Sequence, residues 1–138
     1  MIAGPNGSGK STLVKRLQDD FKVNFYTFVN ADDILAQVSE AGYRTYLYFV
    51  ATANPRINAC RVENRHVQGG HSVPTDKILS RYPRSIAQLR DSLPYLSRAF
   101  VFDNSGSEML FLGEYEQGRG WFFNRPIDTL PTWFTSAL

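Results

Sequence analysis

The stretch GPNGSGKST at residues 4–12 constrains this chain more than any other feature of its sequence. It satisfies the pattern G-x-x-x-x-G-K-[ST], in which glycines leave the backbone free to close its N–H groups around phosphate oxygens. A helix that starts at such a loop also favours anions at its N-terminus. A glycine-rich turn could match the pattern by chance, but apolar residues precede it and amphipathic residues follow it. This context favours a phosphate-binding loop.

The side chains of this loop indicate how it would use a ligand. Lys10 is expected to reach the β- and γ-phosphates of a nucleotide, and the hydroxyl of Ser11 is the expected metal ligand. ATP and Mg²⁺ are therefore the cofactors that the sequence predicts. The expected cofactor-binding residues are Gly4, Pro5, Asn6, Gly7, Ser8, Gly9, Lys10, Ser11 and Thr12.

The composition is that of an ordinary globular domain. Of the 138 residues, 43% are hydrophobic and 20% are charged. No apolar run approaches the ~20 residues that span a bilayer. The net charge of +2 is too small to indicate nucleic acid or a membrane as a partner. The single cysteine, Cys60, excludes an internal disulfide, and no secretory signal is visible, so we expect a soluble cytoplasmic protein.

Hydrophobic periodicity predicts helices and strands in alternation along the chain. Such alternation is typical of an α/β fold whose parallel sheet is covered by helices on both faces, here with a phosphate-binding loop in a single domain over residues 1–138. The apolar and aromatic stretch 120–134 is expected to pack on the core. The last predicted helix is expected to be capped by Thr75 and bent at Pro83. We expect helices at 10–19, after 30–32, at 55–67 and at 75–93, and strands at 25–29, 44–52 and 99–103.

Two spacings in the chain are unusual. Only three residues precede the loop, although a phosphate-binding loop follows a buried strand, so we expect the numbered chain to begin inside that strand. Between Asp32 and Thr45 there is room for about two helical turns, whereas a crossover between parallel strands takes a dozen residues or more. Either this connection is unusually short, or a segment is missing from the numbering between about 35 and 42.

Acidic residues follow two of the expected strands. Asp32 and Asp33 come just after the strand at 25–29, at the kind of strand end where ligands gather in open α/β sheets. A carboxylate there could accept the proton of a hydroxyl that attacks the γ-phosphate, and Asp32 is the better candidate because it lies nearer the strand. The alternative is a helix cap. Asp103, at the end of the strand at 99–103, is either a Mg²⁺ ligand or part of a DNSG turn.

Basic residues gather in the middle of the chain, where they form either a solvated helix face or a surface that faces a polyanion. Planar guanidinium groups stabilise the charge that develops in phosphoryl transfer, so Arg65, Arg81 and Arg84 are candidate catalytic residues. The glycines at 69–70 could form the hinge of a lid, and His71 is either a phosphate donor or structural. The basic residues of this stretch are Arg56, Arg61, Arg65, Lys77, Arg81, Arg84 and Arg90.

Taken together, these motifs resemble those of the zeta-toxin-like P-loop kinases. The resemblance implies an ATP-dependent kinase in which Lys10 and Ser11 bind phosphate and Mg²⁺, and Asp32 is the base. It also implies that Arg65, with Arg81 or Arg84, faces the γ-phosphate. Zeta toxins phosphorylate a sugar hydroxyl of UDP-N-acetylglucosamine, so the resemblance implies a small-molecule acceptor and an antitoxin partner. The matching stretches, in the order of the family, are AGPNGSGKST, NADDI, GYRTYLYFVAT, RVENRHVQGGHSVP, RYPRS and FDNSG.

The chain departs from this family in one segment. Relatives carry a further strand and a substrate-facing acid, within a stretch like FET, between the NAD and GY motifs, and this sequence has neither. Two functions therefore stay open: a small-molecule kinase, and an ATPase or nucleotide-dependent switch without an acceptor. A nucleic-acid kinase would need a basic groove with exposed aromatic side chains. The aromatic residues Tyr43, Tyr46, Tyr48 and Phe49 are instead expected largely within a buried strand.

Overall fold

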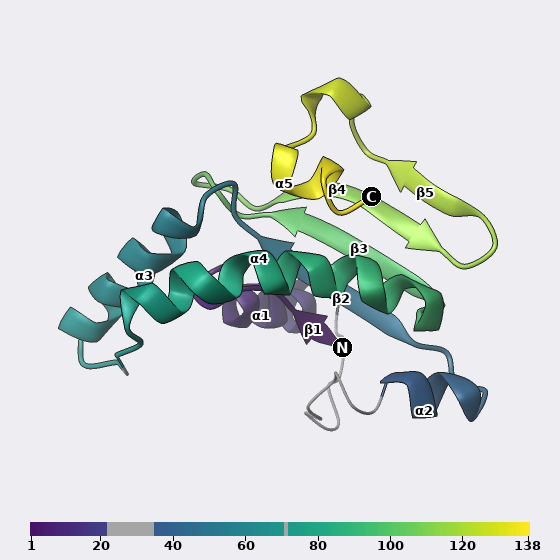
Figure 1. Ribbon diagram of the computed structural model, residues 1–138, viewed down its shortest axis with the longest axis horizontal. Helices are drawn as coiled ribbons and strands as arrows, with labels where there is room; N and C mark the ends of the chain where they lie inside the picture. The colour runs from purple at the N-terminus through teal and green to yellow at the C-terminus, as the bar shows by residue number, and fades with distance from the viewer. Residues whose placement is uncertain (22–34, 71) are drawn as a thin grey trace.

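A five-stranded sheet organises the protein. The computed structural model describes residues 1–21, 35–70 and 72–138 (Figure 1). Its strands lie side by side in the order of the chain, and the first three run parallel, whereas the last two are antiparallel to their neighbours. The strands are β1 (Ile2–Ala3), β2 (Tyr46–Ala51), β3 (Arg98–Asp103), β4 (Leu110–Glu116) and β5 (Gly120–Phe123).

The expectation of an entirely parallel sheet is therefore wrong for β4 and β5. Residues 104–109 join β3 to β4, and this connection is too short for the crossover that a parallel neighbour requires. Residues 117–119 join β4 to β5 in a tight hairpin, with Gly118 at a φ of 80°. The fold is thus mixed α/β, with a parallel part that carries the glycine-rich motif at residues 4–12 and an antiparallel edge.

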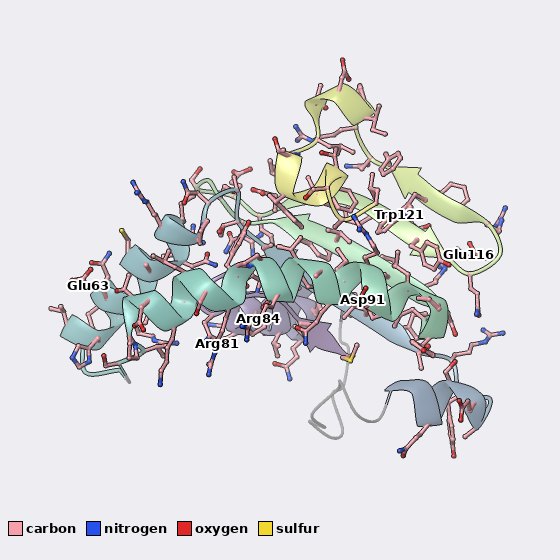
Figure 2. The ribbon with its side chains drawn as sticks, in the orientation of Figure 1. Glu63, Arg81, Arg84, Asp91, Glu116 and Trp121 are labelled. Carbon is pink, nitrogen blue, oxygen red and sulfur yellow. The ribbon has the colours of Figure 1, made fainter. Side chains whose placement is uncertain are left out.

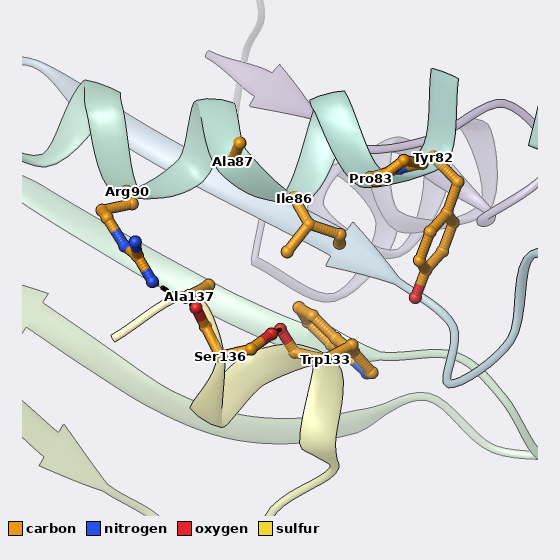
Figure 3. A pocket seen from close by; sticks show the side chains of 8 residues that line it. All are labelled: Tyr82, Pro83, Ile86, Ala87, Arg90, Trp133, Ser136 and Ala137. Carbon is orange, nitrogen blue, oxygen red and sulfur yellow. Dashed lines mark hydrogen bonds between the residues drawn. The ribbon is translucent and has the colours of Figure 1, made fainter. Parts of the chain in front are cut away.

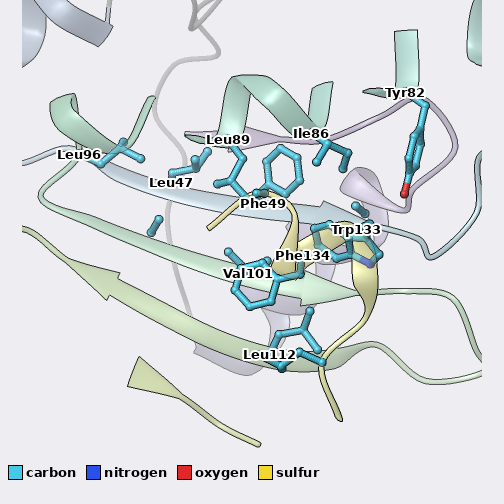
Figure 4. Packing of buried hydrophobic residues seen from close by; sticks show 14 residues of the cluster. Leu47, Phe49, Tyr82, Ile86, Leu89, Leu96, Val101, Leu112, Trp133 and Phe134 are labelled. Carbon is cyan, nitrogen blue, oxygen red and sulfur yellow. The ribbon is translucent and has the colours of Figure 1, made fainter. Parts of the chain in front are cut away.

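Helices cover both faces of the sheet where its strands are parallel. They are α1 (Lys10–Phe21), α2 (Leu35–Glu40), α3 (Pro55–Val67), α4 (Thr75–Ser92) and α5 (Thr132–Thr135), with short 3-10 turns at Leu93–Tyr95 and Ile127–Thr129. The largest core lies between the sheet and the pair α4 and α5 (Figure 4). A smaller core on the opposite face joins Leu13 and Leu17 of α1 to Val50 of β2.

Strand β2 shows why both faces are apolar. Side chains alternate between the faces of a strand, so Leu47 and Phe49 point into the larger core while Val50 points into the smaller one. The C-terminal segment packs on the larger core as expected, since Phe134 is fully buried there. Tyr43 and Tyr46 were expected in a buried strand, but 69% and 38% of their surfaces are exposed, because both precede the covered part of β2.

Most expected elements correspond to observed ones. Helix α3 begins at Pro55 and is capped by Asn54, whose Oδ1 accepts from the backbone N–H of Arg56 at 2.9 Å. The cap of α4 is Pro74, so the expected cap at Thr75 is wrong by one residue. Pro74 has extended backbone angles, and Thr75 is already helical. Pro83 lies inside α4.

Some expectations fall partly outside the part of the chain that the structure describes. The expected strand at 25–29, the candidate base Asp32 and its neighbour Asp33 belong to the undescribed residues. Helix α2 is followed by a turn in which the N–H of Gly42 donates to the carbonyl of Ser39 at 3.0 Å. The hypothesis of a segment missing between about 35 and 42 stays a prediction. Among the described helices, none combines the length and the hydropathy needed to cross a membrane.

Candidate phosphate-binding site

Three chain segments meet at one edge of the sheet. Because β1, β2 and β3 are parallel and in register, their carboxyl ends lie together, and each is followed by a loop or turn. These segments are residues 4–9 after β1, 52–54 after β2 and 104–109 after β3. Ligands of open α/β sheets bind at such an edge. The GPNGSGKST motif therefore lies where the topology of the sheet favours a binding site.

The glycines of the loop allow it to lie directly against its neighbours. Gly4 has a φ of 136°, and a Cβ atom built on it would lie 2.0 Å from the carbonyl oxygen of Val50. Gly7 has a φ of 79°, and its Cβ atom would lie 2.6 Å from the carbonyl oxygen of Asn58 in α3. Any side chain at these two positions would be strained and would collide with backbone. The loop is thus pressed between β2 and α3.

Lys10 turns its ammonium group back onto this loop. Its Nζ donates to the carbonyl oxygens of Gly4 at 2.8 Å and Pro5 at 2.9 Å. Burial, and secondarily the nearby charge of Arg65, lower the pKa of Lys10 below its ordinary value. Arg65 thus adds positive charge that Lys10 feels, and an anion bound at Lys10 would offset that charge. Ser11 and Thr12 are exposed in the first turn of α1, directly after Lys10.

Two buried polar side chains lie at the loop with unused hydrogen-bonding groups. Neither the hydroxyl of Ser8 nor the amide nitrogen of Asn58 has a hydrogen-bond partner among the described residues. The other amide atom of Asn58, Oδ1, accepts from the hydroxyl of Thr52 at 2.7 Å. A buried polar group without a partner costs about 1–3 kcal/mol, so natural proteins retain such groups chiefly where they serve a purpose. These groups fit a site that accommodates a polar ligand.

The three candidate catalytic arginines differ in their relation to the loop. Arg65, in the last turn of α3, is the one whose charge acts on Lys10. Arg81 and Arg84 are exposed on α4 and project from the same side of that helix (Figure 2). Among the described residues, neither makes a hydrogen bond or an ion pair. All three arginines are exposed, and Arg65 is the one whose charge acts on Lys10 of the glycine loop.

Both carboxylate oxygens of Asp103 accept hydrogen bonds from other residues of the protein. It is buried, its Oδ1 accepts from the N–H of Ser105 at 2.8 Å, and its Oδ2 accepts from the indole N–H of Trp133 at 2.7 Å. Of the two interpretations of this residue, the turn is the one that the hydrogen bonds support. The same carboxylate acts on Tyr82, since burial and then the charge of Asp103 raise the pKa of Tyr82 to about 12.

The chain after α3 forms a hydrogen-bonded turn. The N–H of Gly70 donates to the carbonyl of Arg65 at 2.9 Å, and Gly69 adopts a φ of 91°. Nδ1 of His66 lies 3.0 Å from the carbonyl oxygen of Gly70. This backbone turn brings Gly70 against Arg65, since a Cβ atom built on Gly70 would lie 2.8 Å from Cγ of Arg65. His71 lies outside the described residues, so its expected role stays a prediction.

Asn104 is a residue of the site that the sequence did not single out. Its side-chain Nδ2 donates to the carbonyl oxygen of Ser8 at 2.8 Å, and its own carbonyl accepts from Nη1 of Arg61 at 2.7 Å. In the DNSG stretch the sequence pattern indicated roles for Asp103 and the turn, but none for Asn104, although Asn104 directly follows the end of β3. Its position directly after a strand, where ligands of open α/β sheets bind, was the sequence signal that could have identified it. Arg61, counted among the basic residues, thus anchors the turn after β3.

A second hollow lies away from the loop, between α4 and α5 (Figure 3). It has a volume of about 280 Å³ and is mostly apolar. Tyr82 and Trp133 form one end, and Arg90 donates to the carbonyl of Ser136 at the other. Its lining offers little polar chemistry, so the loop at residues 4–12 is the better candidate for a functional site.

Comparisons with known proteins add no relative to this picture. No family model, curated protein or solved structure matches the chain. The proposal of a function therefore rests on the motifs of the sequence and on the geometry of the loop.

Proposed function

We propose that this protein binds MgATP at residues 4–12 and transfers the γ-phosphate to a hydroxyl of a small molecule. The observation that carries the proposal is the placement of Lys10. Its ammonium lies against the carbonyl groups of a glycine loop, at the start of a helix and beside a second cation, Arg65. A triphosphate would replace the carbonyls of Gly4 and Pro5 as the acceptor of Lys10.

The residues at the loop fit the cofactors that the proposal requires. Lys10 would hold the β- and γ-phosphates, and the exposed hydroxyl of Ser11 would hold Mg²⁺. When bound, Mg²⁺ supplies neutralisation of the phosphate charge. The first N–H groups of α1, which have no partner inside the helix, would face the phosphates. The P-loop NTPase fold and kinship with the zeta-toxin-like kinases are part of this proposal.

Transfer to an acceptor assigns roles to further residues. Asp32 would accept the proton of the attacking hydroxyl, and Arg65 would stabilise charge on the transferred phosphate. Arg81 or Arg84 would assist when the segment between α3 and α4 closes over the nucleotide. A nucleotide sugar such as UDP-N-acetylglucosamine is the first acceptor to examine, and an antitoxin is the proposed protein partner.

A second function is favoured by one specific observation. Hydrogen bonds connect the loop through Asn104 to the turn after β3, and Asp103 connects that turn to Trp133 in α5. A change at the loop could therefore reach the C-terminal segment. That connection supports a nucleotide-dependent switch, in which ATP is hydrolysed by water and no small molecule gains phosphate.

One experiment separates these functions. The protein is incubated with γ-labelled ATP, Mg²⁺ and a panel of nucleotide sugars, and label is followed in acceptors and in free phosphate. The test variant is Lys10→Ala, and Lys15→Ala is the matched control because Lys15 is exposed further along the same helix. We expect labelled acceptor from the parent and from Lys15→Ala, and none from Lys10→Ala.

The other outcomes decide between the candidates. Labelled free phosphate without a labelled acceptor would favour the switch. Equal activity of the parent and Lys10→Ala would overturn both functions, because both require Lys10 to act on the phosphate charge.

A further inference from the structure

Hydrogen bonds to β2, to α3 and to the loop hold Asn104 in place. Its backbone N–H donates to the carbonyl of Ala51 at 2.8 Å, its carbonyl accepts from Arg61, and its side chain donates to the carbonyl of Ser8. The acceptor on the loop is a carbonyl oxygen, so only the NH₂ of the amide can face it. The side chain of Asn104 is therefore held with a defined orientation, directly against the loop.

Gly9 shows how close this contact is. Gly9 has a φ of 103°, and a Cβ atom built on it would lie 2.2 Å from Nδ2 of Asn104. Any residue other than glycine would displace the amide and break its hydrogen bond to Ser8. Glycine at this position thus leaves room for Asn104, in addition to allowing the positive φ.

The hydrogen bond to Ser8 also orients the next N–H group of the loop. In a trans peptide the carbonyl and the N–H point in opposite directions, so a carbonyl of Ser8 held by Asn104 turns the N–H of Gly9 away from Asn104. Among the described residues, no hydrogen bond occupies that N–H. It is a free donor with a fixed direction, in the part of the loop next to Lys10.

We propose that Asn104 is a positioning residue of this site, which aims the N–H of Gly9 at the bound phosphate by holding the carbonyl of Ser8. The inference rests on the proposed binding of ATP and extends it to a residue outside the loop. Arg61 supports the arrangement, since its Nη1 donates to Asn104 at 2.7 Å and its Nη2 donates to Gly106 at 3.5 Å. The guanidinium of Arg61 thereby holds the turn that carries Asn104.

The test replaces the amide by a carboxyl group of the same shape. In Asn104→Asp at neutral pH, a carboxylate would face the carbonyl of Ser8 without a proton to donate. We expect ATP affinity to fall about ten- to a hundredfold. Near pH 4 the carboxyl group is partly protonated and donates again, so the affinity of Asn104→Asp relative to the parent should recover. Ser107→Asp is the control, because it adds the same charge to the same turn at an exposed position.

A second variant and a second measurement separate positioning from folding. Asn104→Ala should lose ATP affinity about tenfold at every pH, since it has no group to protonate. The unfolding temperature of each variant without nucleotide shows whether the protein is folded at the titration temperature. In amide NMR spectra, the Gly9 signal of the parent should shift strongly on addition of ATP, and that of Asn104→Ala should shift less.

Each outcome bears on the proposal. Parental affinity in folded Asn104→Asp and Asn104→Ala, or a loss in Ser107→Asp that equals the loss in Asn104→Asp, would overturn the role of Asn104. A parent that binds ATP but transfers no phosphate would refute the kinase. The expected loss of ATP affinity in Asn104→Asp and Asn104→Ala would then still support the role of Asn104. A parent that does not bind ATP would overturn both the proposed function and this inference.

Discussion

At the scale of single residues, the candidate site centres on Lys10 and on the positive charge that Arg65 adds to it. Lys10 is half-buried and directed at the carbonyls of its own loop, and Arg65 adds positive charge beside it. Burial, and secondarily the charge of Arg65, lower the pKa of Lys10. Such a site is poised for an anion, because a bound phosphate compensates both charges.

This pair predicts how ATP affinity depends on pH. Lys10 must be protonated to bind phosphate, and its lowered pKa means that the neutral form appears at lower pH than for an exposed lysine. ATP affinity of the parent should therefore begin to fall at a pH below the ordinary pKa of a lysine. Arg65→Gln removes the repulsion and should move this fall to higher pH. Fluorescence titrations with a labelled ATP analogue measure the affinity against pH for the parent and for Arg65→Gln. If the affinity of both proteins falls over the same alkaline pH range, Arg65 does not act on Lys10.

A second prediction at this scale concerns the proposed base. Asp32→Asn should bind ATP like the parent and lose transfer by roughly a hundredfold or more, since an amide cannot accept the proton of the attacking hydroxyl. Asp33→Asn is the matched control and should stay active. Calorimetric titration gives the ATP affinity, and the labelled-acceptor assay gives the rate. Loss of transfer in Asp33→Asn with an active Asp32→Asn would move the base by one residue.

At the scale of elements, helix α3 supports the loop along its length. On successive turns it places Asn58 against Gly7, Arg61 on the turn after β3, and Arg65 beside Lys10. These positions are three to four residues apart, so they lie on the same side of the helix. A single helix therefore sets the spacing between the loop, its supporting turn and the second cation.

The contact between this helix and the loop can be tested at Gly7. Gly7→Ala places a methyl group 2.6 Å from the carbonyl oxygen of Asn58 at a positive φ, so it should lower the free energy of unfolding by roughly 1–3 kcal/mol. It should also weaken ATP binding, because the loop must move away from α3. Gly106→Ala is the control, since a Cβ atom there meets no other atom within 4 Å. Urea denaturation and ATP titration report the two effects, and equal stability of the two variants would contradict the observed packing.

At the scale of the whole molecule, two cores on opposite faces of the sheet are connected through the strand ends. The smaller core holds α1, which follows the loop, and the larger core holds α4 and the C-terminal segment. Asp103 connects the C-terminal segment to the loop. Its carboxylate accepts a hydrogen bond from Trp133 of α5, and the next residue, Asn104, donates to Ser8 of the loop. The C-terminal helix is thus tied to the edge of the sheet that carries the site.

Trp133 provides a test of this connection. Trp133→Phe keeps an aromatic ring but removes the donor to Oδ2 of Asp103, which would leave a buried carboxylate oxygen without that partner. The free energy of unfolding should fall by about 1–3 kcal/mol beyond the effect of the smaller ring. Trp121→Phe is the control for ring size, since Trp121 also packs against the larger core, with its ring centroid 5.1 Å from that of Phe134. Urea denaturation measures the difference, and equal losses in both variants would exclude a contribution from the hydrogen bond.

The sequence alone determined the features that depend on neighbouring residues. The glycine motif predicted a loop with an unrestricted backbone, and Gly4, Gly7 and Gly9 indeed have positive φ angles. The spacing of Leu13 and Leu17 predicted α1, and Pro55 predicted the start of α3. These signals are local, because the conformational freedom of glycine, the fixed φ of proline and helical periodicity act over a few residues. The candidate ligands of the phosphates were therefore identified before the fold was known.

Only the tertiary structure decided which distant residues support that loop. Asn104 contacts Ser8 across 96 positions of sequence, and Arg61 reaches Asn104 across 43. Such contacts depend on the order and direction of the strands, and no local pattern encodes either. The same reason explains why the sheet was wrongly expected to be parallel throughout and why the hydrogen bond between Asp103 and Trp133 was not expected. The loop has the sequence of a phosphate site, and the residues that hold it in shape come from the packing of strands and helices around it.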